Sequence, residues 1–115
     1  MKLRGRLILA QLEAFKYYKE IENKNILTNK EIEDFVAFIY PELPINDLNL
    51  KGNLEKERIR HCANKGIDSP SVSSGRNILR KVSPSTWEVI NDDIFAYNGI
   101  TLDMVMEKFN NSKIN

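Results

Sequence analysis

The stretch "NILRKVSPSTWEVI", residues 77–90, constrains the fold of this chain most strongly. Two short runs of mixed apolar and polar residues flank Pro84, and the second run contains Trp87, the only tryptophan. Strand-forming residues on both sides of a proline turn predict a small two-stranded β-hairpin. Because an isolated hairpin is only marginally stable in water, we expect it to pack on other elements through Trp87 and Val89.

Three helices are predicted ahead of the hairpin. Apolar residues spaced four and three apart, from Leu3 to Ile21, predict a first helix that packs against two neighbours. The sequence "TNKE" at 28–31 has the pattern of a capping box, which marks the start of a second helix. That helix is expected to end near Tyr40, because Pro41 has no N–H and its ring clashes with the preceding turn.

The third helix is predicted to span about 53–65, with Asn53 as its N-terminal cap and Gly66 just beyond its end. Its expected buried face comprises Leu54 or Glu55, Ile59, Cys62 and Ala63. After the hairpin, "NDD" at 91–93 precedes a last helix, whose tail at 110–115 is expected to fray. The apolar side of this last helix consists of Leu102, Val105, Met106 and Phe109.

This order of elements predicts a mainly α fold with a small β-hairpin. Three helices followed by a hairpin are typical of a winged helix-turn-helix, here with an added C-terminal helix. We expect a winged-helix domain at 1–90, with the wing at 77–90, and a C-terminal helical extension at 91–115. A chain of 115 residues is long enough for one domain with a modest core.

The N-terminal stretch "MKLRGRLILAQLEAF" is basic and then apolar, as a signal peptide would be. Gln11 and Glu13 interrupt the apolar run and no small-residue cleavage site follows, so we interpret it as a helix. No apolar run approaches the ~20 residues that span a bilayer. The single cysteine, Cys62, is typical of a reducing compartment, so we expect a cytoplasmic location and no membrane partner.

Charge is segregated along the chain, although the net charge is only +1. Residues 1–30 carry a balance of +4, 31–55 of −5, 56–81 of +5 and 82–115 of −3. The block at 56–81 allows a nearly neutral protein to present one basic face. Charges scattered over a solvated surface are the alternative that composition leaves open.

The later helix of a helix-turn-helix lies in the major groove of DNA, so the third predicted helix is the candidate recognition helix. Arginine pairs with guanine and asparagine with adenine, whereas lysine and the basic wing residues suit phosphate oxygens. The candidate DNA-binding residues are Lys56, Arg60, His61, Asn64 and Lys65 of the helix, with Arg76, Arg80 and Lys81 of the loop and wing. Any amphipathic helix shows a polar strip to water, and Glu57 interrupts this one, so a solvated face remains the alternative.

Residues that suggest catalysis have simpler interpretations. His61 and Cys62 are adjacent and point about 100° apart on a helix, so they cannot form a nucleophile–base pair. We expect Cys62 to be a small buried residue and Trp87 to anchor the hairpin in the core instead of stacking on a base.

A metal site is not expected either. One cysteine and one histidine are too few for structural zinc. "ENK" at 22–24 has the Glu-x-Lys spacing of metal-dependent nucleases, but no suitably placed acidic partner precedes it on a strand. Asp92 and Asp93 are neighbours that would diverge, whereas two-metal sites need converging carboxylates. We therefore expect no enzyme activity, no cofactor and no metal.

The sequence "ERIRHCANKGIDSPSVSSGRNILRKVSPSTWEVI", residues 57–90, resembles the winged-helix domain at the N-terminus of Mrr-like and related modification-dependent restriction endonucleases. The likeness includes the pair Ile59 and Arg60, the strand "NILRKV" and the tryptophan-containing strand "TWEVI". It also includes a loop rich in serine and aspartate, formed by Asp68, Ser69, Ser71, Ser73 and Ser74. The wing turn "SPST" departs from the family, where glycines are usual. The resemblance implies DNA recognition by the third helix and wing, and it places the nuclease chemistry in a separate domain.

Two functions therefore stand ahead of a third, metal-dependent cleavage of duplex DNA, for which the sequence offers no active site. The first is binding of double-stranded DNA, as a recognition domain of a restriction system or as a small regulator of phage or mobile-element origin. The alternative is a protein–protein interaction module without DNA binding, either an inhibitor or a dimerising winged helix. The apolar surfaces of the first and last helices would serve a protein partner or a second copy.

Overall fold

A computed structural model describes residues 6–44, 48–62 and 78–114 of the chain. They form a mainly helical α/β domain, with five helices and a three-stranded antiparallel sheet. In chain order the elements are α1 (Arg6–Ile21), β1 (Ile26–Thr28), α2 (Asn29–Ile39), α3 (Leu48–Arg60), β2 (Leu79–Ser83), β3 (Thr86–Val89), α4 (Asp93–Tyr97) and α5 (Leu102–Ile114). None of the described helices is long and apolar enough to span a membrane.

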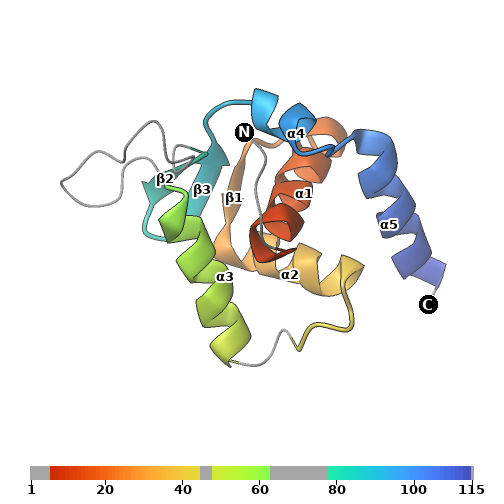
Figure 1. The fold of residues 1–115 in the computed structure, drawn as a ribbon, viewed down its shortest axis with the longest axis horizontal. Helices are drawn as coiled ribbons and strands as arrows, with labels where there is room; N and C mark the ends of the chain where they lie inside the picture. Colours follow the sequence, from red (N-terminus) through yellow and green to blue (C-terminus); the bar gives the residue numbers. More distant parts are fainter. Residues whose placement is uncertain (1–5, 45–47, 63–77, 115) are drawn as a thin grey trace.

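Helix α1 is the centre of the structure, with the sheet and α3 to one side and α5 to the other (Figure 1). It contacts α2, α3 and α5. All six residues from Ala10 to Phe15 are buried, so the middle of the helix is covered on every side. The expected stripe with two neighbours is therefore too narrow a description. Ile21, the last member of that stripe, is exposed at the helix end.

The capping box predicted for α2 is confirmed. The Glu31 backbone N–H donates to Thr28 Oγ1 at 3.1 Å, and the Thr28 N–H donates to Glu31 Oε1 at 2.9 Å. The predicted end is also confirmed, because Tyr40 is the C-terminal cap residue and Pro41 follows it. The helix buries Ile32, Phe35, Val36 and Ile39 at helical spacing.

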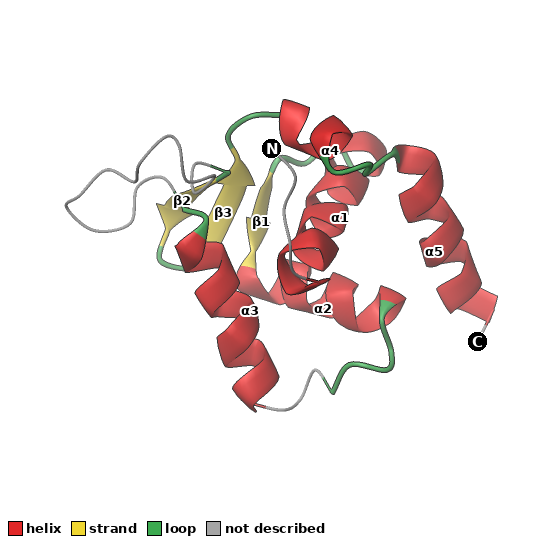
Figure 2. Cartoon of the chain, in the orientation of Figure 1, coloured by secondary structure: helices red, strands yellow, loops and turns green. Residues whose placement is uncertain are grey.

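The predicted hairpin is confirmed as β2–β3, but it is not isolated. Strand β1, which we did not predict, pairs with β3, so the strand order is β1-β3-β2 (Figure 2). Trp87 is buried in the core and its indole Nε1 donates to Asn29 Oδ1 at 2.7 Å. The expectation that Trp87 anchors the hairpin is therefore confirmed.

Helix α3 begins at Leu48, so the predicted start at Asn53 is wrong and Asn53 lies inside the helix. The helix ends at Arg60, and residues 63–66 of the predicted segment lie outside the described residues. The expected buried face is partly wrong, because Ile59 is 38% exposed. Leu54 and Cys62 are buried as predicted, and Arg58, which was not predicted, is buried between them, so the buried residues recur every fourth position.

The C-terminal segment shares the same core as the rest of the domain. Val105 of α5 is buried, and the Phe109 ring stacks on Tyr17 of α1 with ring centroids 4.7 Å apart. Helix α4 was not predicted, and α5 continues to Ile114, so the expected fraying of the tail from residue 110 is wrong.

Candidate nucleic-acid interface

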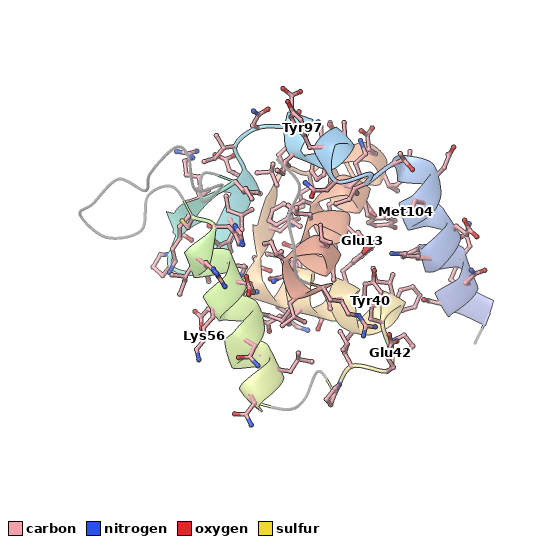
Figure 3. The ribbon with its side chains drawn as sticks, in the orientation of Figure 1. Glu13, Tyr40, Glu42, Lys56, Tyr97 and Met104 are labelled. Atoms are coloured by element: carbon pink, nitrogen blue, oxygen red, sulfur yellow. The ribbon has the colours of Figure 1, made fainter. Side chains whose placement is uncertain are left out.

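The exposed side chains of α3 are mostly polar, and three of the four that carry a charge are basic. Its exposed residues are Asn49, Lys51, Asn53, Glu55, Lys56, Ile59 and Arg60. Asn53, Lys56 and Arg60 are three and four residues apart, so they lie in one stripe along the helix. Lys56 points away from the rest of the molecule (Figure 3). Lys56 and Arg60, both predicted from the sequence, therefore share one exposed stripe.

Gln11 of α1 fixes the opposite side of α3. Its Oε1 accepts a hydrogen bond from Arg58 Nη1 at 2.8 Å, and its Nε2 donates to the Leu54 carbonyl oxygen at 3.2 Å. Nε2 is also 3.1 Å from the Leu7 carbonyl oxygen of its own helix. One buried amide therefore binds both a side chain and the backbone of α3, which holds the helix in a defined orientation on α1.

Arg58 links α3 to two further elements. Its side chain is 1% exposed, and its Nη2 lies 3.3 Å from Glu33 Oε2 of α2. The guanidinium carbon is 5.4 Å from the centroid of the Trp87 ring of β3. Burial lowers the pKa of Arg58, and Glu33 opposes that shift. The guanidinium therefore joins α2, α3 and the hairpin strand at one point beneath the outward stripe.

The end of α3 is tied to the sheet through His61. The His61 carbonyl oxygen accepts from the backbone N–H groups of Ile78 and Leu79, both at 3.0 Å. Its side chain is 12% exposed, and Nε2 lies 3.5 Å from Glu57 Oε2. Arg60 Nη1 lies 3.9 Å from the other oxygen of Glu57. Arg60 thus remains exposed beside a carboxylate, whereas His61 offers little surface to a partner.

The two adjacent basic residues of β2 face opposite sides of the sheet. Lys81 pairs in register with Trp87 on the side facing the helices, and its Nζ is 5.0 Å from the Trp87 ring centroid. Arg80 pairs with Glu88 on the outer face, where its Nε donates to Glu88 Oε1 at 2.6 Å. Ile26 of β1 pairs with Glu88 on this same outer face. Arg80 is therefore already paired with a carboxylate, away from the side on which Lys81 lies.

Three candidate DNA-binding residues and the candidates for catalysis or metal binding remain to be placed. Asn64, Lys65 and Arg76 lie outside the described residues. Cys62 is buried, as expected for a small structural residue. Within residues 6–44, 48–62 and 78–114, no group of three or more histidine, cysteine, aspartate and glutamate side chains could hold a metal ion.

A hollow of about 480 Å³ lies where β3 ends, between α1 and α4. Phe15 and Phe95 contribute apolar surface to it, and Lys19, Glu88 and Asp92 contribute charge. These charged groups are already engaged, because Lys19 pairs with Asp92 and Glu88 pairs with Arg80. The residues that line the hollow come from other elements than α3, so it is separate from the outward stripe.

Sequence reasoning missed the buried partners of α3. The sequence contains an indication for Gln11, because a polar residue there interrupts the apolar stripe of α1 and the position is fully buried. It contains no such indication for Arg58, since an arginine between Glu57 and Ile59 cannot be told from a solvated helix residue. Comparisons of the chain with protein-family models, with curated proteins and with solved structures find no match.

Proposed function

We propose that this protein binds double-stranded DNA as a winged helix-turn-helix, with α3 as the recognition helix and the β2–β3 hairpin as the wing. The observation that carries the proposal is the exposed stripe of Asn53, Lys56 and Arg60 on a helix whose other side is fixed to the core. The element order, three helices and then a hairpin that packs on them, supports it. Such a chain serves as the recognition domain of a restriction system or as a small cytoplasmic regulator.

The chemistry of the stripe suits a nucleic acid. Lys51, Lys56 and Arg60 are exposed cations on α3, and Glu55 is the exposed acid among them. Arginine and asparagine side chains can each form two hydrogen bonds to a base edge in the major groove. Lys51 lies half a turn round the helix from Arg60, so Lys56 and Arg60 are the two cations of the stripe itself. If each of these two cations neutralises one phosphate, the logarithm of the affinity falls with the logarithm of the salt concentration with a slope of about −2.

Fluorescence anisotropy with labelled duplexes of random sequence, at several salt concentrations, tests the proposal. Lys56→Ala and Arg60→Ala are each expected to weaken binding and to reduce the salt slope by about 1. Lys113→Ala is the matched control, because it removes one charge from α5, on the other side of α1 (Figure 1). Absence of salt-dependent duplex binding by the wild-type protein would refute the proposal.

A second candidate function is binding of a protein partner, and one observation favours it. Ile26 and Ile90 are exposed at the sheet, as is Val82 next to the hairpin turn. The apolar surface first assigned to such a partner, on the first and last helices, is instead largely used inside the molecule, where α1 and α5 contact each other. Sedimentation velocity at several protein concentrations, with Ile26→Ser as the comparison, tests self-association through the sheet.

A further inference from the structure

Helix α3 contains two poor helix-forming residues in its interior. Gly52 and Asn53 follow the first turn of a helix that runs from Leu48 to Arg60. Glycine is the weakest helix former after proline, and asparagine is weaker than alanine or lysine. Both residues therefore reduce the stability of the helix in which they lie, and a compensating role is expected of them.

The fold itself does not require the glycine. A methyl group at Gly52 would meet no heavy atom within 4 Å, so no neighbouring element needs the space. Among the glycines that the structure describes, Gly99 is the one with a positive φ, so Gly52 does not serve an unusual backbone conformation. Asn53 is exposed, and its side chain does not cap the helix, which begins five residues earlier.

The position of these residues on the helix is informative. Asn53, Lys56 and Arg60 fall within an arc of about 60° around the helix axis, and Gly52 lies beside Lys56 on that outward side. A glycine on an exposed helix face leaves the backbone open to close approach by another molecule. The cations Lys56 and Arg60, one and two turns further along the helix, favour a polyanion as that molecule.

We propose that Gly52 lets the helix backbone of α3 approach duplex DNA closely, and that Asn53 reads a base edge, with adenine as its preferred base. This inference rests on the proposed DNA-binding function and adds a specificity-determining residue to it. The Asn53 amide has the donor and the acceptor that match N7 and N6 of adenine. Lys56 and Arg60, about one and two turns further along the same stripe, then add a phosphate contact and a second reading position.

The test uses the full chain and three variants: Gly52→Ala, Asn53→Ala and, as a control, Asn110→Ala. Asn110 is exposed on α5, so its replacement changes helix propensity away from α3. All three variants are expected to raise the melting temperature, because alanine is the best helix former. Gly52→Ala and Asn53→Ala are expected to weaken duplex binding about tenfold or more, and Asn110→Ala is expected to leave it unchanged.

Site selection from random duplexes completes the test. The wild-type protein is expected to select adenine at one position, and Asn53→Ala is expected to lose that preference while it keeps the others. Salt-dependent binding by the wild type, together with unchanged affinity of Gly52→Ala and Asn53→Ala, would overturn the inference and leave the proposed function standing. A lower melting temperature of Gly52→Ala would also overturn it, since the fold would then need the glycine. No duplex binding by any of the proteins would refute both.

Discussion

Replacing Arg58 with alanine tests whether a buried cation holds α3 on the core. The change removes the 2.8 Å hydrogen bond to Gln11 and the 3.3 Å ion pair with Glu33. It leaves the buried Gln11 Oε1 and the Glu33 carboxylate without that partner, and removal of one member of a buried pair typically costs about 3–5 kcal/mol.

Two features of the structure place the cost near the lower end of that range. The Glu33 side chain is 18% exposed, so water can partly solvate its carboxylate once Arg58 is gone. The Nε of Arg58 has no hydrogen-bond partner among the described residues, so the wild-type arrangement already carries part of the cost of burial. We expect a loss of about 3 kcal/mol, a large part of the roughly 5–15 kcal/mol that stabilises a domain of this kind.

Urea denaturation followed by circular dichroism measures this loss. With an m value of about 1.5 kcal/mol/M, the midpoint is expected to fall by about 2 M. Arg60→Ala is the matched control, because this arginine is exposed and 3.9 Å from Glu57, and it is expected to cost less than about 1 kcal/mol. A loss below about 1 kcal/mol for Arg58→Ala would show that apolar contacts of Leu54 and Cys62 suffice to hold α3, and would contradict the role of Arg58 in attaching the helix.

Two other contacts give further predictions. Burial and the hydrogen bond to Glu13 raise the pKa of Tyr40. Burial alone would lower the pKa of Lys108, but its hydrogen bonds to Glu13 and Tyr40 outweigh burial and raise that pKa. Both groups hold their protons more tightly in the folded state, so stability is expected to fall as pH rises above about 10. Urea midpoints at pH 8 and 11 measure this fall, which should be smaller in Tyr40→Phe, and an equal midpoint at both values would contradict it. Thr28→Ala removes the cap that binds the Glu31 N–H and should cost about 1 kcal/mol, or a melting temperature about 4 °C lower by thermal denaturation; an unchanged value would contradict the role of the cap.

The contacts around Lys108 show how α5 is attached to the rest of the domain. Its Nζ lies 2.8 Å from Glu13 Oε2 and 2.7 Å from the Tyr40 hydroxyl oxygen. Figure 3 shows Glu13 on α1 and Tyr40 at the end of α2, both on the side of α1 that faces α5. The buried Glu13, which in the sequence only interrupts an apolar run, therefore joins three helices.

The parts of the fold that could be predicted are those determined by residues close together in the sequence. Thr28 and Glu31 are close in sequence and satisfy each other's backbone groups, so the start of α2 could be predicted from four residues. Trp87 lies in a run of strand-forming residues after a proline turn, and its burial followed from the need of a hairpin for support. Strand β1 could not be predicted in this way, because three residues are too few to show an alternation of apolar and polar side chains. It forms through its pairing with β3, which is distant in the sequence.

The start of α3 could not be predicted because tertiary contacts override local preference there. Asn49, Gly52 and Asn53 are poor helix formers, so the segment resembled a connector. The helix forms because Leu54 and Arg58, four residues apart, are buried against the rest of the domain. In the candidate interface, adjacent residues of a strand point to opposite faces of a sheet, so the sequence already implied that Arg80 and Lys81 face opposite sides. The pairing of Arg80 with Glu88 depends on the register between β2 and β3, which only the structure shows.

The polar contacts of α3 also determine which of its residues face outward. Leu54 and Cys62 are the only apolar side chains of 48–62 that are fully buried among those described. Burial of apolar surface is non-directional, so these two contacts alone do not fix the rotation of the helix about its axis. Hydrogen bonds are directional, and Gln11 binds both the Arg58 side chain and the Leu54 carbonyl oxygen. A slip of one residue would rotate α3 by about 100° and break both bonds. Gln11 and Arg58, which are buried and cannot touch a partner, therefore specify that Asn53, Lys56 and Arg60 point away from the core.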